Sequence, residues 1–326
     1  MSDLGTPNWL ATAVKLPASA TLTKACIDLN LSIAQYFATN NSILPTIFET
    51  ILRIQFDSSL KMNMSTLKNV LFVPHGAPTF ALDSGAAGYA IARIAGEFPT
   101  PRAVLCISPH WETSTPTLGT ARQLETIYDF YGFDERLYKI KYPATGCPEL
   151  AVEIQKVMLE NNFECLLDPG RGLDHGAWIP LRQIYPDANV PIVPLSLQGH
   201  AGPEYAYKLG QVLSELPDRG ILILASGNLT HNLGDYRQIK AEGGTTPEYI
   251  QRFADWLHEM LSEGDIDSLI NYRKINKDGA RAHPTEEHLL PLFVALGAAG
   301  KEARAQAFYR GINDYVLAMD AYIFRA

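Results

Sequence analysis

Short apolar runs alternate with helix-like segments over most of this 326-residue chain. The runs are four to eight residues long and rich in β-branched side chains, which is typical of buried strands. The segments between and after them repeat apolar residues every three or four positions, as amphipathic helices do. The predicted strands are 70–73, 103–108, 190–197 and 221–226, and the predicted helices are 148–162, 203–217 and 246–264. This alternation predicts an α/β fold: a single domain with a central, largely parallel or mixed β-sheet flanked by helices.

Residues 1–67 differ from the rest of the chain in composition. They are rich in Thr, Ser and Asn, carry few charges and contain no recognisable motif. We therefore expect a poorly packed N-terminal extension of unknown role at 1–67, followed by the folded domain at 68–326.

The overall composition is that of a soluble globular protein, with 47% hydrophobic and 19% charged residues. A net charge of −8 argues against nucleic acid or an anionic membrane as the main partner, because either would favour a basic surface. The four cysteines form no C-x-x-C pair, which favours reduced thiols over a disulfide framework. Neither a membrane-spanning run nor a secretory signal is recognisable, so a cytoplasmic location is expected.

Three of the eight histidines come directly after predicted strands. His75 ends "NVLFVPHG", His110 ends "RAVLCISPHW", and His231 follows "ILILAS" in the block "SGNLTHN". In α/β sheets, functional groups gather beyond the carboxyl ends of the strands, where the loops converge. We therefore expect these three imidazoles to meet in one crevice.

Two further histidines have turn-forming neighbours. His175 lies in "GLDHGAWIP" and His283 in "ARAHPTEEHLLPLF". Glycine and proline fix the local turn and allow close approach of the backbone, so both histidines are candidates for the same site. His288 lies five residues after His283, and on a helix the two would point about 140° apart. This spacing is wrong for a zincin helix, and His288 is expected to face the core or the edge of the pocket.

The remaining histidines are interpreted as structural. His258 falls inside the predicted helix 246–264, and His200 lies in a loop that leads into a helix.

The chemistry that a cluster of histidines supports is metal binding, because imidazole binds zinc, copper and iron. A closed structural zinc site would use close spacings and cysteine, whereas these histidines are spread along the chain. The pattern predicts an open, reactive metal site in which extra histidines act as acid and base near neutral pH. The sequence contains no G-x-S-x-G elbow, P-loop or G-x-G-x-x-G motif.

Six blocks together resemble the class III (LigB-type) extradiol ring-cleavage dioxygenases, in the branch of DOPA 4,5-dioxygenase-like proteins. The resemblance spans roughly residues 69–310 and leaves 1–67 outside. The blocks are "FVPHGAP", "ISPHWET", "YDFYGF…LYKIKYPATG", "GLDHGAWIPL…YPDANVPIVPLSL", "SGNLTHNL" and "AHPTEEHLLPLFVALGAA".

This resemblance implies a catalytic α/β domain with one metal ion per chain, Fe(2+) or Zn(2+), at the carboxyl edge of the sheet. His75 and His110 would be metal ligands, and His283 would take the remaining ligand position. His231 would act next to the metal, as catalytic base or as an additional ligand, and His175 would line the substrate pocket. Relatives that cleave protocatechuate use a glutamate where this chain has His283, and an all-histidine set also suits zinc.

The function that the resemblance implies is extradiol opening of a catechol ring with O2, the catechol being DOPA or a related catecholic acid. His231 would remove a catechol proton, and His175 or His231 would return it. Two alternatives are a zinc-dependent hydrolase and a non-enzymatic, Memo-like binding protein on the same fold. Four aromatic residues are interpreted either as stacking partners for the substrate or as core residues: Trp111, Tyr128, Tyr131 and Trp178.

Overall fold

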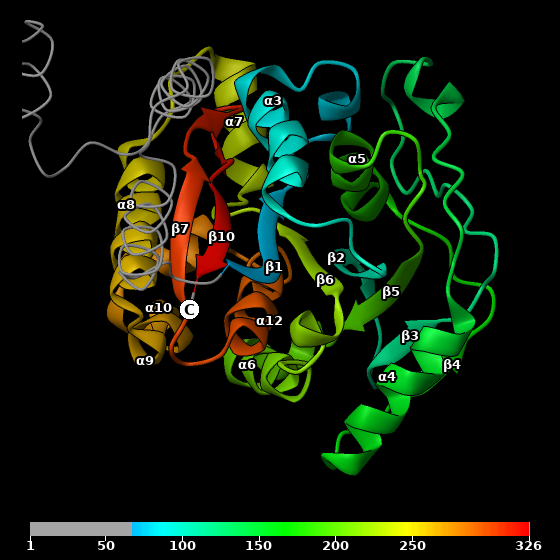
Figure 1. The fold of residues 1–326 in the computed structure, drawn as a ribbon. Coiled ribbons are helices and arrows are strands. Elements are labelled where there is room, and N and C mark those ends of the chain that lie inside the picture. Colours follow the sequence, from blue (N-terminus) through cyan, green and yellow to red (C-terminus); the bar gives the residue numbers. More distant parts are fainter. Residues whose placement is uncertain (1–66, 326) are drawn as a thin grey trace, which may run out of the picture. The chain divides into compact units, whose positions relative to one another are not determined.

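An eight-stranded mixed sheet runs through residues 67–325, the part of the chain that the structure, a computed structural model, describes (Figure 1). The extension expected at 1–67 lies outside the described residues except for Leu67, where the first strand begins. The strands of the sheet are β1 (Leu67–Pro74), β2 (Ala103–Glu112), β3 (Thr117–Gly119), β4 (Leu166–Asp168), β5 (Ile192–Leu197), β6 (Ile221–Gly227), β7 (Arg304–Tyr309) and β10 (Ala321–Arg325).

The strand order is β4-β3-β5-β2-β6-β1-β10-β7. Neighbours among β5, β2, β6 and β1 pair in parallel, whereas β10 pairs antiparallel with both β1 and β7. The carboxyl ends of β1, β2 and β6 therefore lie at the same edge of the sheet. A separate two-stranded ribbon is formed by β8 (Ile312–Asn313) and β9 (Leu317–Ala318).

The predicted strands are confirmed, because each of the four apolar runs lies within or overlaps one of the strands β1, β2, β5 and β6. Every side chain of β5 and of β6 is buried, as expected for central strands with both faces covered. The expected α/β fold with a mixed, helix-flanked sheet is likewise confirmed.

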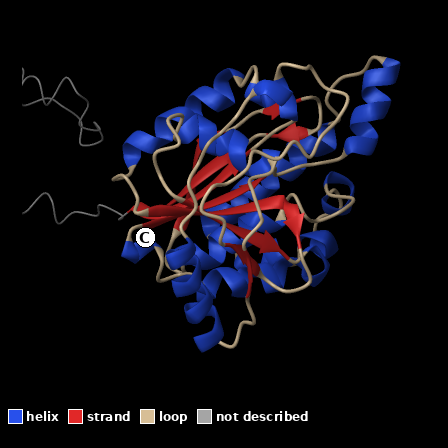
Figure 2. Ribbon diagram, turned by 90° about the vertical axis from the view of Figure 1, so that its right-hand side faces the viewer, coloured by secondary structure: helices blue, strands red, loops and turns tan. Residues whose placement is uncertain are grey.

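Helices lie on both faces of the sheet (Figure 2). They are α3 (Gly85–Ile94), α4 (Pro148–Glu160), α5 (His175–Ile184), α6 (Gly202–Val212), α7 (Leu233–Glu242), α8 (Glu248–Glu263), α9 (Ile266–Ile270), α10 (Tyr272–Ile275), α11 (Gly279–Ala282) and α12 (Leu290–Ala299). Short 3-10 turns are η1 (Pro78–Ala81), η2 (Ala95–Glu97), η3 (Leu137–Lys139), η4 (Gly199–Ala201) and η5 (Pro217–Arg219). The apolar α12 packs on α6, β6 and β1, whereas α5 packs on α3, β2 and β6.

The predicted helix at 246–264 is confirmed by α8. Pro247 immediately precedes the helix, and Gly264 ends it with a φ of +73°, a left-handed conformation that glycine adopts without strain. The apolar stripe of this helix faces the core, with Ile250, Phe253 and Leu257 fully buried. The helix predicted at 203–217 is shorter in the structure, because α6 ends at Val212 and the chain continues in turns.

Three of the four cysteines lie in the described residues, and Cys106, Cys147 and Cys165 are all free thiols. Cys106 and Cys165 are buried. None of the helices between residues 67 and 325 has the length and apolar character needed to cross a membrane.

Candidate functional site

A cavity of about 870 Å³ opens at the carboxyl edge of the sheet, beyond the ends of β1, β2 and β6. Its walls include five histidines, which come from five separate parts of the chain. They are His75, His110, His175, His231 and His288.

His75 and His110 face each other at the centre of this cluster. Their Nε2 atoms lie 3.2 Å apart, and Nδ1 of His75 lies 3.1 Å from the Ser226 hydroxyl on β6. The parallel register explains this contact, because Ser226 is paired with Val73, two residues before His75. Two ring nitrogens thus point at one another in a partly buried place, close enough to share a hydrogen bond or to bind one ion.

Burial keeps these two imidazoles neutral. It holds the pKa of His75 well below its usual value, with His110 adding to the effect, and it lowers the pKa of His110 to about 3, with His175 adding to the effect. A neutral imidazole offers the nitrogen lone pair that a metal ion requires. His75, His110 and His175 have ring nitrogens within 4.8 Å of one another, so together they could hold one metal ion.

His175 is held by Asp129. The backbone N–H of His175 donates to Oδ1 of Asp129 at 2.9 Å, and its Nδ1 donates to Oδ2 at 2.9 Å. The same Oδ2 lies 3.7 Å from Nδ1 of His110. Burial opposes ionisation of Asp129, yet the hydrogen bonds from His175 outweigh it and lower the carboxyl pKa to about 2. The ionised Asp129 therefore fixes the His175 tautomer and leaves Nε2 as the free ring nitrogen.

The start of α5 places His175 against β2. Asp174 caps the helix by accepting from the Ala177 N–H at 3.1 Å, and it also accepts from the Ser108 hydroxyl at 2.5 Å. A Cβ at Gly176 would collide with the Ser108 hydroxyl oxygen, so only glycine allows this approach of helix to strand. The "DHG" block thus holds the start of α5 against β2, through the Asp174–Ser108 hydrogen bond and the close approach at Gly176.

The opposite side of the cluster consists of His231, Glu287 and His288, whose ligand atoms also lie within 4.8 Å of one another. The rings of His231 and His288 stack at 3.5 Å and 8°. Nδ1 of His288 lies 2.9 Å from Oε1 of Glu287. Burial lowers the pKa of His231 to about 4 and also lowers that of His288, so both rings are neutral at neutral pH.

His288 also lies close to His75 and His110, on the other side of the cluster. Its ring centroid lies 5.4 Å from that of His75 and 5.0 Å from that of His110. The sequence expectation placed His288 in the core or at the edge of the pocket, and the structure has it buried and lining the cavity between the two groups.

His283, which the resemblance suggested as a ligand, belongs to neither group. It is fully buried, and its Nε2 donates to the Leu229 carbonyl at 2.8 Å. The segment between α11 and α12 is a turn rather than a helix, so the angle calculated for two histidines five apart on a helix does not apply. The structure brings His288, not His283, together with His75 and His110.

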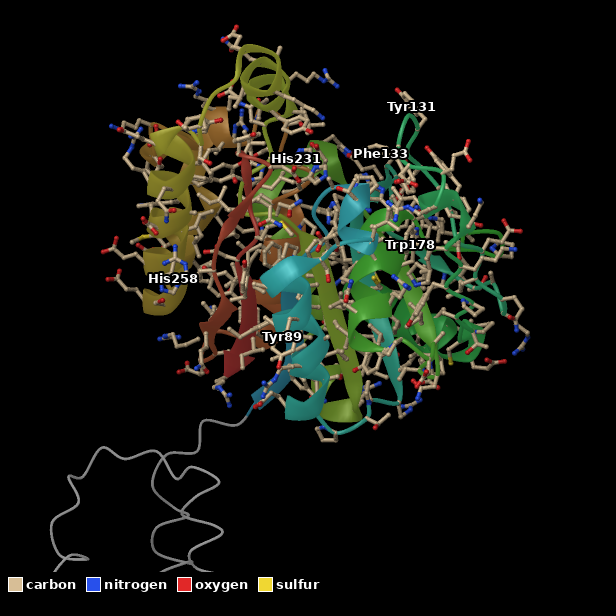
Figure 3. All side chains as sticks on the ribbon, turned by 90° about the horizontal axis from the view of Figure 1, so that it is seen from above. Tyr89, Tyr131, Phe133, Trp178, His231 and His258 are labelled. Atoms are coloured by element: carbon tan, nitrogen blue, oxygen red, sulfur yellow. The ribbon has the colours of Figure 1, made fainter. Side chains whose placement is uncertain are left out.

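The two histidines interpreted as structural lie outside the cavity. His258 is on α8, away from His231 in Figure 3, and its Nδ1 lies 3.3 Å from the Tyr322 hydroxyl. His200 is exposed in η4.

Aromatic side chains form part of the cavity wall next to the histidines. Phe130 packs edge-on against His175 with ring centroids 5.6 Å apart, and Tyr131 and Phe133 follow at the exposed lip (Figure 3). Trp178 is a core residue whose indole N–H donates to the Ile127 carbonyl at 3.1 Å. Of the four aromatic residues considered from the sequence, Tyr131 is the one that lines the cavity.

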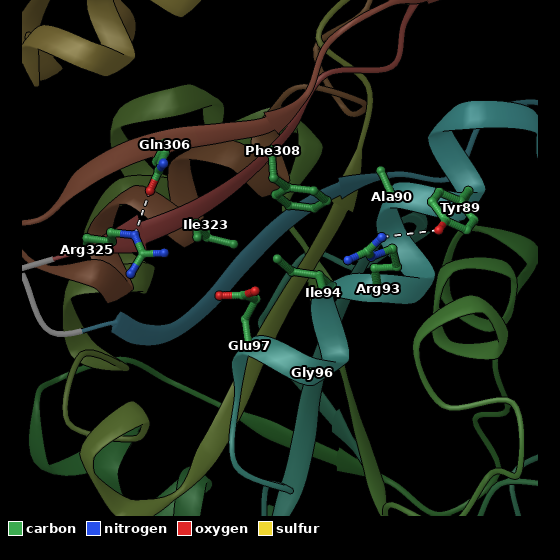
Figure 4. Close-up of a pocket in the computed structure, with 10 residues that line it drawn as sticks. All are labelled: Tyr89, Ala90, Arg93, Ile94, Gly96, Glu97, Gln306, Phe308, Ile323 and Arg325. Carbon is green, nitrogen blue, oxygen red and sulfur yellow. Dashed lines mark hydrogen bonds between the residues drawn. The ribbon is translucent and has the colours of Figure 1, made fainter. Parts of the chain in front are cut away.

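A second hollow of about 620 Å³ lies between α3 and the strands β7 and β10 (Figure 4). It is lined by residues such as Tyr89, Arg93, Phe308 and Arg325, and no histidine lines it. Two of its polar side chains are tied to neighbours, Arg93 to the Tyr89 hydroxyl at 3.2 Å and Arg325 to Gln306 at 2.6 Å. The histidine cavity is therefore the better candidate for an active site.

Residues 74–316 match a family described as the catalytic LigB subunit of aromatic ring-opening dioxygenase. A protein of Beta vulgaris named 4,5-DOPA dioxygenase extradiol is 37% identical over 268 residues, which is 79% of this chain and 97% of that protein. A protein of the same name from Mirabilis jalapa is 40% identical over 210 residues, which is 64% of this chain and 78% of that protein.

A solved structure has the same fold. The crystal structure of an uncharacterized protein from Escherichia coli K12 superposes with a TM-score of 0.67 at 29% sequence identity. The match covers 80% of this chain and all of that protein.

Proposed function

Since the chain belongs to the LigB family and is an extradiol ring-cleavage dioxygenase, we propose that it opens a catechol ring in the histidine cavity with the help of one bound metal ion. The observation that supports this most directly is the pair of neutral imidazoles of the buried His75 and the partly buried His110, whose Nε2 atoms are 3.2 Å apart. Ring nitrogens placed this close to each other are also placed to bind one shared ion.

We propose that His75, His110 and His288 hold this ion, with His231 beside them. The donor set fits a metal, because all four imidazoles are neutral and their rings lie close together. The His288 ring contacts those of His75, His110 and His231, and the His75 ring contacts that of His110. Imidazole suits both iron(II) and zinc. When bound, iron(II) would supply the activation of catechol and of dioxygen that ring opening requires.

The protein groups around the ion would move protons. His175, oriented by Asp129, offers Nε2 to a catechol hydroxyl and can later return the proton to the ring-opened product. His231 occupies the other side of the cluster and is the second candidate for the same task. Phe130 and Phe133 line one side of the cavity and provide an apolar surface against which an aromatic ring can pack.

The substrate that we propose is DOPA or a related catecholic acid. Support comes from the names of the Beta vulgaris and Mirabilis jalapa relatives and from the apolar, aromatic wall of the cavity. A cavity of about 870 Å³ lies within the range typical of small-molecule sites.

The test is anaerobic reconstitution with iron(II), followed by exposure to air with DOPA and simple catechols. We expect oxygen uptake and a coloured ring-opened product with iron(II), and neither with zinc. A protein that takes up no oxygen with any catechol would contradict the proposed function. Hydrolysis of an ester panel by the zinc-loaded protein alone would instead favour a zinc hydrolase.

A further inference from the structure

The outer wall of the histidine cavity carries a group of charged and polar side chains that the proposed chemistry does not use. Tyr236 and Lys240 come from successive turns of α7, and Asp314 comes from the turn between β8 and β9. The Lys240 ammonium donates to the Tyr236 hydroxyl at 3.0 Å and lies 5.3 Å from the centre of the Tyr236 ring.

Most other charged groups on this wall already have partners. Asp134 accepts three hydrogen bonds of 2.8 to 3.1 Å from the Arg136 guanidinium. Glu287 accepts from the Thr285 hydroxyl at 3.0 Å and lies 2.9 Å from Nδ1 of His288. Lys240 is the one lysine or arginine among the described residues that line the cavity. It has two ammonium hydrogens left after its bond to Tyr236.

Asp314 is held at the cavity wall by an unusual backbone. Asp314 and Tyr315 both have positive φ, at +46° and +62°, and such values are rare for an aromatic residue. The Asp314 carboxylate interacts electrostatically with the Lys240 ammonium, so that a negative and a positive group lie on the same wall. The hydrogen bond to Tyr236, helped by this carboxylate, raises the pKa of Lys240, so the ammonium stays charged.

We propose that Lys240 and Tyr236 bind a carboxylate on the side chain of the catechol, and that Asp314 binds an ammonium group on the same side chain. The inference rests on the proposed function, because it takes the catechol ring to lie at the histidines. The Tyr236 oxygen accepts from Lys240, which leaves its own O–H free to donate. Lys240 and Tyr236 can therefore give a carboxylate two hydrogen bonds, one of them from a charged donor.

The arrangement selects substrates by their tail. A catechol whose tail carries both charges would match Lys240 and Asp314 together, whereas a tail with an amine alone would pair with Asp314 and leave Lys240 without a partner from the substrate. A neutral alkyl catechol would fill the aromatic part of the cavity and leave both charged groups solvated. These residues would thus determine specificity without touching the ring.

The experiment uses four catechols that differ only in the tail: 4-ethylcatechol, 3-(3,4-dihydroxyphenyl)propionate, dopamine and DOPA. Both kcat/KM for oxygen uptake and the anaerobic dissociation constant, by calorimetry, are measured with the iron(II)-reconstituted protein. The variants are Lys240→Met, Tyr236→Phe and Asp314→Asn. Arg237→Met is the matched control, because it removes the same charge from α7 at a residue that does not line the cavity.

In Lys240→Met we expect the preference for the carboxylate-bearing catechol over 4-ethylcatechol to fall about tenfold or more, in kcat/KM and in binding. Tyr236→Phe should lower the same ratio less, and Asp314→Asn should lower the preference for dopamine over 4-ethylcatechol. Arg237→Met should leave both ratios as in the parent.

Equal changes in Lys240→Met and Arg237→Met, or no change in either, would overturn the assignment of the tail-binding residues. If no catechol is turned over but anaerobic binding shows the expected ratios, the proposed reaction is wrong and the assignment of Lys240, Tyr236 and Asp314 to the substrate side chain is retained. Absence of both turnover and binding for all four compounds would end both proposals.

Discussion

His288 and His283 lie five residues apart and have different surroundings, which makes them a matched pair for a test of metal ligation. His288 is in ring contact with His75, His110 and His231, whereas the Nε2 of His283 is occupied by the Leu229 carbonyl. We expect His288→Gln to lose most of the bound iron(II) or zinc. His283→Gln should keep the metal, because the glutamine amide can still donate to Leu229.

Atomic absorption after gel filtration measures the metal content of the two variants. Loss of metal in His283→Gln with full retention in His288→Gln would show that the ligand suggested by the family resemblance was right. Thermal unfolding is the control for folding, because removing a buried hydrogen-bond partner costs about 1–3 kcal/mol without regard to metal.

Asp129 accepts a hydrogen bond from His175, and a substitution at Asp129 tests whether this bond orients the imidazole. Asp129→Asn keeps the shape of the side chain but removes the charge that accepts from Nδ1 of His175. The amide can present its NH2 group instead and favour the wrong tautomer, so we expect kcat to fall about 10²-fold or more, with KM and metal content little changed. Asp187→Asn, an exposed substitution, is the matched control. Unaltered turnover in Asp129→Asn would remove the role of Asp129 in orienting His175.

At the scale of elements, the contact between α5 and β2 is the one on which the site depends most. In Gly176→Ala the new methyl would collide with the Ser108 hydroxyl oxygen and lie 2.7 Å from Cδ2 of His110. The helix start must therefore move, which should cost about 1–3 kcal/mol of stability and lower turnover. Gly96→Ala is the control, since nothing lies within 4 Å of the position that its methyl group would occupy. Urea unfolding should show a lower free energy of unfolding, and oxygen uptake a lower turnover, in Gly176→Ala than in Gly96→Ala.

The elements themselves are largely predictable from local pattern. The apolar runs before His75 and His110 form β1 and β2, because short, β-branched runs that are apolar on both faces are typical of central strands. That His288 lines the cavity and His283 does not is not predictable, because it depends on a turn whose geometry has no periodic signal. Asp129 lies inside the block "YDFYGF", where no spacing marks it as the partner of His175. Lys240 lies in a solvent-facing helix with no motif, and only the fold places it on the cavity wall.

For the whole molecule, the assembly of many buried neutral histidines makes stability depend on pH. Burial lowers the pKa of His110 to about 3 and that of His231 to about 4, whereas the unfolded chain has histidines with a pKa of about 6.5. The unfolded state therefore binds more protons below pH 6.5, and stability falls as the pH decreases from there toward 4. Above pH 6.5 both states are deprotonated and this contribution to stability is fully present.

Urea unfolding of the metal-free protein between pH 4 and pH 7.5 checks this dependence. His231→Gln should reduce the slope by at most about 1.4 kcal/mol per pH unit between pH 4 and 6.5, which is the effect of one proton. The exposed His200→Gln should follow the parent curve. Because protons compete with a metal for the same lone pairs, saturating zinc should raise stability more at pH 7.5 than at pH 5. A parent profile that is flat from pH 7.5 to 4, or that rises toward acid, would be incompatible with neutral imidazoles buried around one site.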